Sequence, residues 1–164
     1  MSPSFTALLI ALQASSTTAP FEFRGLTVAT TEAEAVQRGI VNSCKKHLIP
    51  GVRECALTDR SLAGRSTLFG VVQFRQGRMV HIGALVSSQY FGLVRGALDE
   101  RYGKPCLVNP STERRRGPGD SIYWCFDDGA VRLQQYATGG MTSFSYYARS
   151  YDDLIGDLRP SIDF

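Results

Sequence analysis

Residues 97–106, ALDERYGKPC, place a helical pattern, a glycine, a proline and a cysteine in direct succession. Leu98 and Tyr102 continue the apolar side of a helix, and Gly103 tolerates the left-handed backbone with which helices often end. The proline that follows prevents the helix from resuming. The stretch therefore predicts a helix end, with Cys106 in place to anchor it through a disulfide.

Four cysteines allow three pairings if all of them are oxidised. Cys106 follows one predicted helix and Cys125 lies in the first predicted strand after it. Cys44 closes an earlier predicted helix, and Cys55 lies in the strand that follows. Pairing Cys44 with Cys55 and Cys106 with Cys125 costs the least chain entropy of the three pairings, because it closes local loops. We predict this pairing.

The same order of elements occurs twice along the chain. A helix is predicted over residues 30–47, where Thr31 and Glu34 have the spacing of a capping box, and a second helix begins after Ser87. Strands are predicted from alternating apolar residues and turn signals, at 52–58, 67–75 and 78–86 after the first helix and at 121–126, 130–137 and 141–149 after the second. Ser150 is expected to cap a short C-terminal helix whose apolar side is Leu154, Ile155 and Leu158.

The predicted fold class is therefore α+β. It consists of two tandem units, 20–86 and 87–164, each a helix plus a three-stranded antiparallel sheet, and the second unit adds the C-terminal helix. We expect the two units to pack as one domain.

This layout resembles the BamE-like superfamily, and within it the tandem-repeat beta-lactamase inhibitory proteins. The duplicated order, the placement of the four cysteines and the opening FRGLTVATTEAEAV (residues 23–36) carry the resemblance. It implies an exported protein with two helix-plus-sheet repeats, each holding one local disulfide. It assigns no binding residue to any position of this sequence.

Composition narrows the functional classes. The chain has 164 residues, of which 43% are hydrophobic and 20% charged, and no apolar run is long enough for a transmembrane anchor. Its 18 basic residues stand against 15 acidic ones, a density well below that of a nucleic-acid-binding protein. Nucleic acid is therefore not the expected partner.

Residues 1–19 have the layout of a signal peptide, with an apolar stretch from Phe5 to Leu12 and small residues after it. They lack a positive charge before the apolar stretch, so the alternative is a disordered arm. Export to the periplasm or the medium and an even number of cysteines support each other, because disulfides persist outside the cytosol.

No catalytic motif occurs in the sequence. Cys44, His47 and Cys55 offer zinc ligands at unremarkable spacing, and the disulfide interpretation is favoured over the metal. His47 and His81 are the only histidines, which leaves little material for imidazole catalysis. We therefore expect no cofactor and no metal.

Binding residues are suggested instead by alternation along the strands of the second unit. If Cys125 points toward the helix, Trp124 points to the opposite, outward face. The residue types on that face are enriched at interaction hot spots: Trp124, Arg132, Tyr136, Tyr147 and Arg149, with Gln73, Arg75 and His81 as the outward set of the first unit. The alternative is that this face packs against the other half of the molecule.

Arg114, Arg115 and Arg116 lie on a predicted loop and offer a contact for an anion or an acidic partner, unless they are simply solvated. The leading hypothesis is an exported, non-enzymatic module that binds another protein through its open sheet face, as an inhibitor or an assembly factor would. One alternative is a ligand-binding protein or small enzyme with a site between the two units, near His81 or Arg114. A second alternative is a structural component of the cell envelope.

Overall fold

The computed structural model describes residues 19–109, 118–136 and 140–151. The signal-peptide prediction, the three consecutive arginines and most of the predicted C-terminal helix lie outside these residues. The helical elements are α1 (Glu32–Gln37), the 3-10 turn η1 (Ser88–Tyr90) and α2 (Phe91–Tyr102). The strands are β1 (Val41–Lys46), β2 (Val52–Leu57), β3 (Ser61–Leu62), β4 (Arg65–Ser66), β5 (Phe69–Arg75), β6 (Arg78–Ser87), β7 (Leu107–Asn109), β8 (Pro118–Phe126), β9 (Gly129–Tyr136) and β10 (Met141–Ala148).

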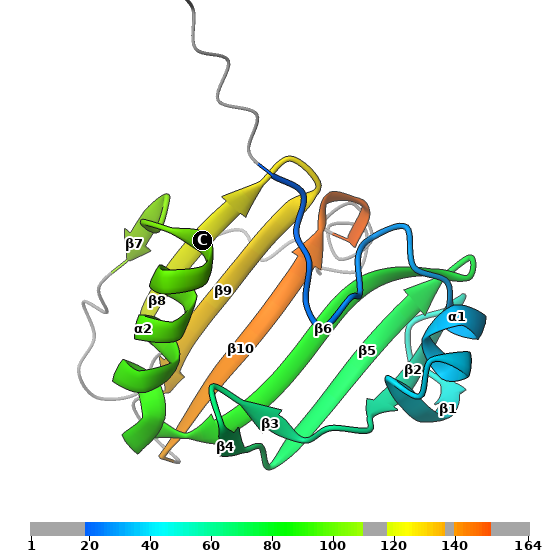
Figure 1. Ribbon diagram of the computed structural model, residues 1–164, viewed down its shortest axis with the longest axis horizontal. Helices are drawn as coiled ribbons and strands as arrows, with labels where there is room; N and C mark the ends of the chain where they lie inside the picture. Colours follow the sequence, from blue (N-terminus) through cyan, green and yellow to red (C-terminus); the bar gives the residue numbers. More distant parts are fainter. Residues whose placement is uncertain (1–18, 110–117, 137–139, 152–164) are drawn as a thin grey trace, which may run out of the picture.

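Eight strands form one antiparallel sheet in the order β1-β2-β5-β6-β10-β9-β8-β7, and β3 and β4 form a separate small hairpin (Figure 1). The two halves of the chain meet in the middle of the large sheet, where β10 pairs with β6 from Met141↔Ser87 to Tyr147↔His81. This β6–β10 pair is the seam of the molecule.

The prediction of two tandem helix-plus-three-stranded units is wrong. All the principal strands belong to a single sheet, and β1 and β7 extend it at both edges beyond the predicted strands. Separate sheets would leave β6 and β10 as edges with unpaired backbone groups, and pairing these strands with each other satisfies both.

The helix predicted over 30–47 was too long. The capping box is present, because the Thr31 hydroxyl accepts from the Glu34 amide and the Glu34 carboxylate accepts from the Thr31 amide. However, α1 ends after one and a half turns, since Gly39 adopts a φ of 67°. The residues from Val41 onward then form β1, which pairs with β2. Val41 and Cys44 have a helical spacing, and both reach the core from a strand because β1 has a register shift between Asn42 and Lys45, where Ser43 adopts a φ of 51°.

The second helix, α2, lies where the sequence predicts it. Val94 and Leu98 are its buried residues, and Gly103 follows it with a φ of 80°. In Figure 1, α2 crosses in front of β8 and β9. The side of the sheet that α2 covers is therefore the core side.

The core side carries a row of six side chains that are at most 1% exposed: Cys55, Val72, Ile82, Tyr146, Val131 and Trp124. The row crosses the seam, so both halves contribute to one hydrophobic core. Trp124 thus faces α2 and not outward, and its indole Nε1 donates to the Gly103 carbonyl at 3.0 Å.

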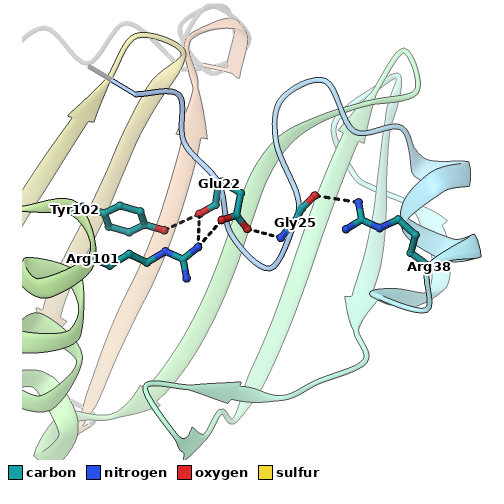
Figure 2. Close-up of polar contacts among 5 residues, drawn as sticks. All are labelled: Glu22, Gly25, Arg38, Arg101 and Tyr102. Carbon is teal, nitrogen blue, oxygen red and sulfur yellow. Dashed lines mark hydrogen bonds and ion pairs between the residues drawn. The ribbon is translucent and has the colours of Figure 1, made fainter. Parts of the chain in front are cut away.

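Residues 21–26 form an N-terminal strap that runs over the core side between α2 and α1 (Figures 1 and 2). The Phe21 ring stacks on Tyr146 with 3.8 Å between centroids, and Phe23 packs against Phe144 at 5.4 Å. Phe21 is fully buried, so the strap is an integral part of the core.

Polar contacts hold the strap at both ends (Figure 2). The Glu22 carboxylate pairs with the Arg101 guanidinium at 2.6 Å, and the Glu22 carbonyl accepts from the Tyr102 hydroxyl at 2.9 Å. Glu22 also accepts from the Gly25 amide, while Arg38 after α1 donates to the Gly25 carbonyl at 3.0 Å. The strap thereby links the two helices across the sheet.

Both predicted disulfides are present, Cys44–Cys55 and Cys106–Cys125. The first joins the adjacent strands β1 and β2, and the second joins the segment after α2 to β8. Among the residues that the structure describes, none of the helices has the length and apolar character needed to cross a bilayer.

Candidate binding face of the sheet

The other side of the sheet, which we call the polar face, carries mostly polar side chains. Because side chains alternate along each strand, the register places one row of residues across seven strands from β1 to β8: Lys45, Glu54, Gln73, His81, Tyr147, Ala130 and Cys125. A second row contains Gly83, Ser145 and Arg132. The helical residues 149–151, which follow β10, bring Tyr151 to this face.

Gln73 is the centre of a hydrogen-bond network on the polar face and is only 5% exposed. Its Oε1 accepts from the Tyr151 hydroxyl at 2.8 Å, and its Nε2 donates to the Glu54 carboxylate at 3.1 Å. Burial raises the pKa of Tyr151 to about 12, so its hydroxyl remains a donor at physiological pH. Hydrogen bonds of this kind hold the amide and phenol in single orientations.

The Glu54 carboxylate extends this network toward the edge of the sheet. Its two oxygens lie 3.6 Å from the Lys45 ammonium and 3.6 Å from Nε2 of His47. Lys45 is largely exposed, so its ion pair contributes little to stability. Its main effect is to add a positive charge to the outer end of the polar row.

His81 lies at the seam and is 9% exposed. Its ring stacks on Tyr151 at 5.2 Å and contacts Tyr147 at 4.8 Å. Burial, and to a lesser extent the nearby Arg132 and His47 side chains, lowers the pKa of His81 to about 3. The imidazole is therefore neutral at physiological pH and serves as an aromatic packing element.

Gly83, one pleat further along β6, gives the His81 ring its space. A Cβ at this position would lie 2.9 Å from Cε1 of His81, a distance at which the imidazole would have to move. The absence of a side chain at this position therefore sets where the histidine can lie.

Arg132 and Tyr147 form a paired cation and aromatic ring on the polar face. The Arg132 guanidinium donates to the Tyr147 hydroxyl at 3.0 Å and lies 5.3 Å from the centroid of the Tyr147 ring. The Tyr147 ring is partly buried against the core cluster. Cation–π contact and hydrogen bond together orient both side chains.

The predicted binding residues thus separate into several groups. Arg132, Tyr136 and Tyr147 lie on the polar face, and Tyr136 is 37% exposed. Arg149 follows β10 at the rim, whereas Trp124 lies in the core. Arg114, Arg115 and Arg116 lie outside the described residues. The structure therefore brings Arg132 and Tyr147 into contact, and it places Tyr136 on the same face at the far end of β9.

Sequence reasoning missed Glu54, His47 and Tyr151 as members of this face. Glu54 and His47 are far from β9 and β10 in sequence. The strand register brings Glu54 into the polar row, and His47 lies against the Glu54 carboxylate just after β1. Tyr151 follows the last strand, where alternation no longer indicates a direction.

One group of metal-ligating residues occurs in the described part of the chain. Ligand atoms of Glu32, Cys44 and Cys55 lie within 4.8 Å of one another. Both sulfurs belong to a disulfide, and a zinc ligand must be a thiolate. This group does not fit a metal in the oxidised protein.

Comparison with family models, curated proteins and solved structures finds no match to this chain. The resemblance to the BamE-like superfamily therefore stays a prediction.

Proposed function

We propose that this protein is an exported, non-enzymatic binding module that recognises another protein through the polar face of its sheet. The observation that carries the proposal is the Arg132–Tyr147 pair, which stands at one end of a row of packed polar and aromatic side chains from Glu54 through Gln73 and His81 to Tyr147. Arginine and tyrosine are enriched at protein–protein hot spots, and side chains already fixed in one orientation lose less entropy on binding.

Both disulfides support the export part of the proposal. Disulfides persist in oxidising compartments and are rare in the cytosol, so two intact pairs fit an extracellular or periplasmic location. Recognition of a partner there would serve either an inhibitory role or the assembly of an envelope complex.

The state of His81 favours binding over acid–base catalysis at the seam. A general acid or base works best with a pKa near the working pH, whereas the pKa of His81 is lowered to about 3. His47 lies beside Glu54 at the edge of the network. Imidazole packing on Tyr147 and Tyr151 fits a rigid recognition surface.

The test is partner recovery from the native host. Tagged wild-type protein, Tyr147→Ala and Arg132→Gln are expressed there, crosslinked, purified and compared by quantitative mass spectrometry. Removal of a hot spot costs about 2 kcal/mol or more, so we expect at least one protein to be depleted about tenfold or more in both variants.

Tyr90→Ala is the matched control, because this partly buried aromatic residue also has an arginine over its ring, Arg65 at 5.2 Å, but lies outside the polar face. Partner recovery should be unchanged in it. Equal recovery by the wild type and both polar-face variants, with native circular dichroism, would rule out this surface.

A further inference from the structure

A separate cavity opens at one end of the sheet, beyond the β5–β6 turn and the end of β10. Its volume is about 410 Å³, enough for a small organic molecule. It is lined by Val28, Arg75, Gln76, Arg78, Met79, Val80, Asp128, Ala148, Arg149 and Ser150. Residues from the N-terminal region, both halves of the sheet and the β8–β9 turn therefore meet in its wall.

The lining of this cavity contains three arginines and one acidic residue, Asp128. Arg75 and Arg78 are direct partners across the β5–β6 hairpin, and like charges in such a cross-strand position destabilise a sheet. Among the ion pairs formed within the described residues, none includes Arg75, Arg78 or Arg149. Arg78 donates to the Ala29 carbonyl at 2.9 Å, and its charge helps to lower the pKa of the Glu34 carboxyl. The positive charge that lacks a paired anion among the described residues is therefore that of Arg75 and Arg149.

Asp128 has a structural role in the wall. Its Oδ1 accepts from the Phe21 amide at 3.2 Å, and its carbonyl accepts from the Tyr146 hydroxyl and from the Arg149 amide. These bonds tie the β8–β9 turn to the strap and to the end of β10. Its carboxylate does not form an ion pair with the arginines of the cavity among the described residues.

The rest of the lining includes apolar side chains. Met79, Val80 and Ala148 are each at most 5% exposed and supply a hydrophobic surface beside the guanidinium groups. Such a combination suits a ligand with a carbon skeleton and more than one acidic group, since guanidinium groups bind carboxylate and phosphate in bidentate fashion.

The geometry points to a binding site for a small organic anion that carries two or more carboxylate or phosphate groups, held by Arg75 and Arg149, with Arg78 adding positive charge at the rim. This site is separate from the Arg132–Tyr147 pair, and it does not depend on the function proposed for the polar face. Gln76 and Gly77 at the β5–β6 turn, with φ of 50° and 77°, fold the hairpin tightly enough to bring Arg75 and Arg78 to the same rim.

Isothermal titration calorimetry on the full chain in 150 mM salt tests the inference with two probes, glutarate for carboxylates and pyrophosphate for phosphates. Glutaramide, which has the glutarate skeleton without charge, is the neutral control. We expect saturable binding of at least one anion at one site, and none of glutaramide. Which anion binds more tightly identifies the acidic group.

Arg75→Gln and Arg149→Gln should each weaken the binding about tenfold. Neither side chain forms an ion pair among the described residues, so both variants should keep the wild-type circular dichroism spectrum. Arg60→Gln changes the net charge equally at an exposed position outside the cavity and should stay within about twofold of wild type. Absence of saturable binding for both anions, or equal weakening in Arg60→Gln, would overturn the assignment.

Discussion

Two residues on opposite sides of the sheet show that the face on which a side chain lies determines whether it stabilises the core or is available for binding. Trp124 and Arg132 are both residue types of interaction surfaces, yet Trp124 is 1% exposed under α2 while Arg132 lies on the opposite face against Tyr147. The indole has a partner inside the core, the Gly103 carbonyl. A buried tryptophan with a satisfied N–H contributes to stability, and it is not available to a partner.

His81 should make the protein less stable as the pH falls. Its pKa is about 3 in the folded state against 6.5 for the free side chain, so the unfolded chain takes up this proton first. Above about pH 6.5 the ring is neutral in both states and has no effect on the pH dependence of the free energy of unfolding. Between about pH 6.5 and pH 3 this free energy falls by about 1.4 kcal/mol for each pH unit, because only the unfolded chain binds the proton. Urea unfolding at pH 7.0 and 4.5 should therefore show a smaller drop for His81→Phe than for wild type.

Parallel curves for wild type and His81→Phe between these two pH values would contradict a buried, neutral His81.

The sequence pattern of the N-terminal strap gives little sign that this segment contributes to the hydrophobic core. It has no regular secondary structure beyond a bridge between Phe23 and Leu26, yet it places Phe21 and Leu26 in the core with no exposed surface. Burial of these side chains, with the Phe21 ring packed on Tyr146 and Phe126, explains why residues without a helical or strand pattern are held in place.

Phe21 and Glu22 should differ sharply in what their substitution costs. Phe21→Ala removes a fully buried ring that stacks on Tyr146, and such truncations cost about 3–5 kcal/mol. Glu22→Gln loses an ion pair with Arg101 whose side chains are 44% and 50% exposed, which is worth at most about 1 kcal/mol. Urea unfolding followed by circular dichroism measures both, and an equal loss in the two variants would contradict the packing role of the strap.

The seam and the disulfides connect parts of the chain that differ in their separation along the sequence. The β6–β10 pair joins residues about sixty positions apart, whereas the disulfides close loops of 11 and 19 residues within each half. Each disulfide links an edge strand, or the segment leading into one, to its neighbour. The crosslinks therefore reinforce the outer strands, while hydrogen bonds and core packing hold the centre.

Removing either disulfide should destabilise the protein measurably. For loops of this length the expected loss is about 3 kcal/mol, or about 6–12 °C in Tm for a chain of this size. Scanning calorimetry of the Cys44→Ala/Cys55→Ala and Cys106→Ala/Cys125→Ala double variants measures this loss. Reduction of the wild-type protein should add about four hydrogens to its mass, and free thiols in the native protein would contradict both pairs.

Local features of the sequence were sufficient for part of this structure. Capping by Thr31, the stop of α2 at Gly103 and the pairing of the four cysteines depend on residues close together along the chain. Backbone conformation and loop-closure entropy govern such features, and these are properties of short segments. Alternation along β9 and β10 likewise put Arg132, Tyr136 and Tyr147 on one side, although it does not say which side is buried.

Only the tertiary structure decided that the two halves share one sheet, that residues 41–46 form a strand and that Trp124 faces the core. Each outcome depends on pairing between distant strands, and local spacing does not encode that pairing. A shift of one residue in register, or a wrong choice of which face α2 covers, moves every side chain of a strand to the other side. The sequence alone therefore determined which residues lie together along a strand, and the packing of α2 and the strap determined which of them meet a partner.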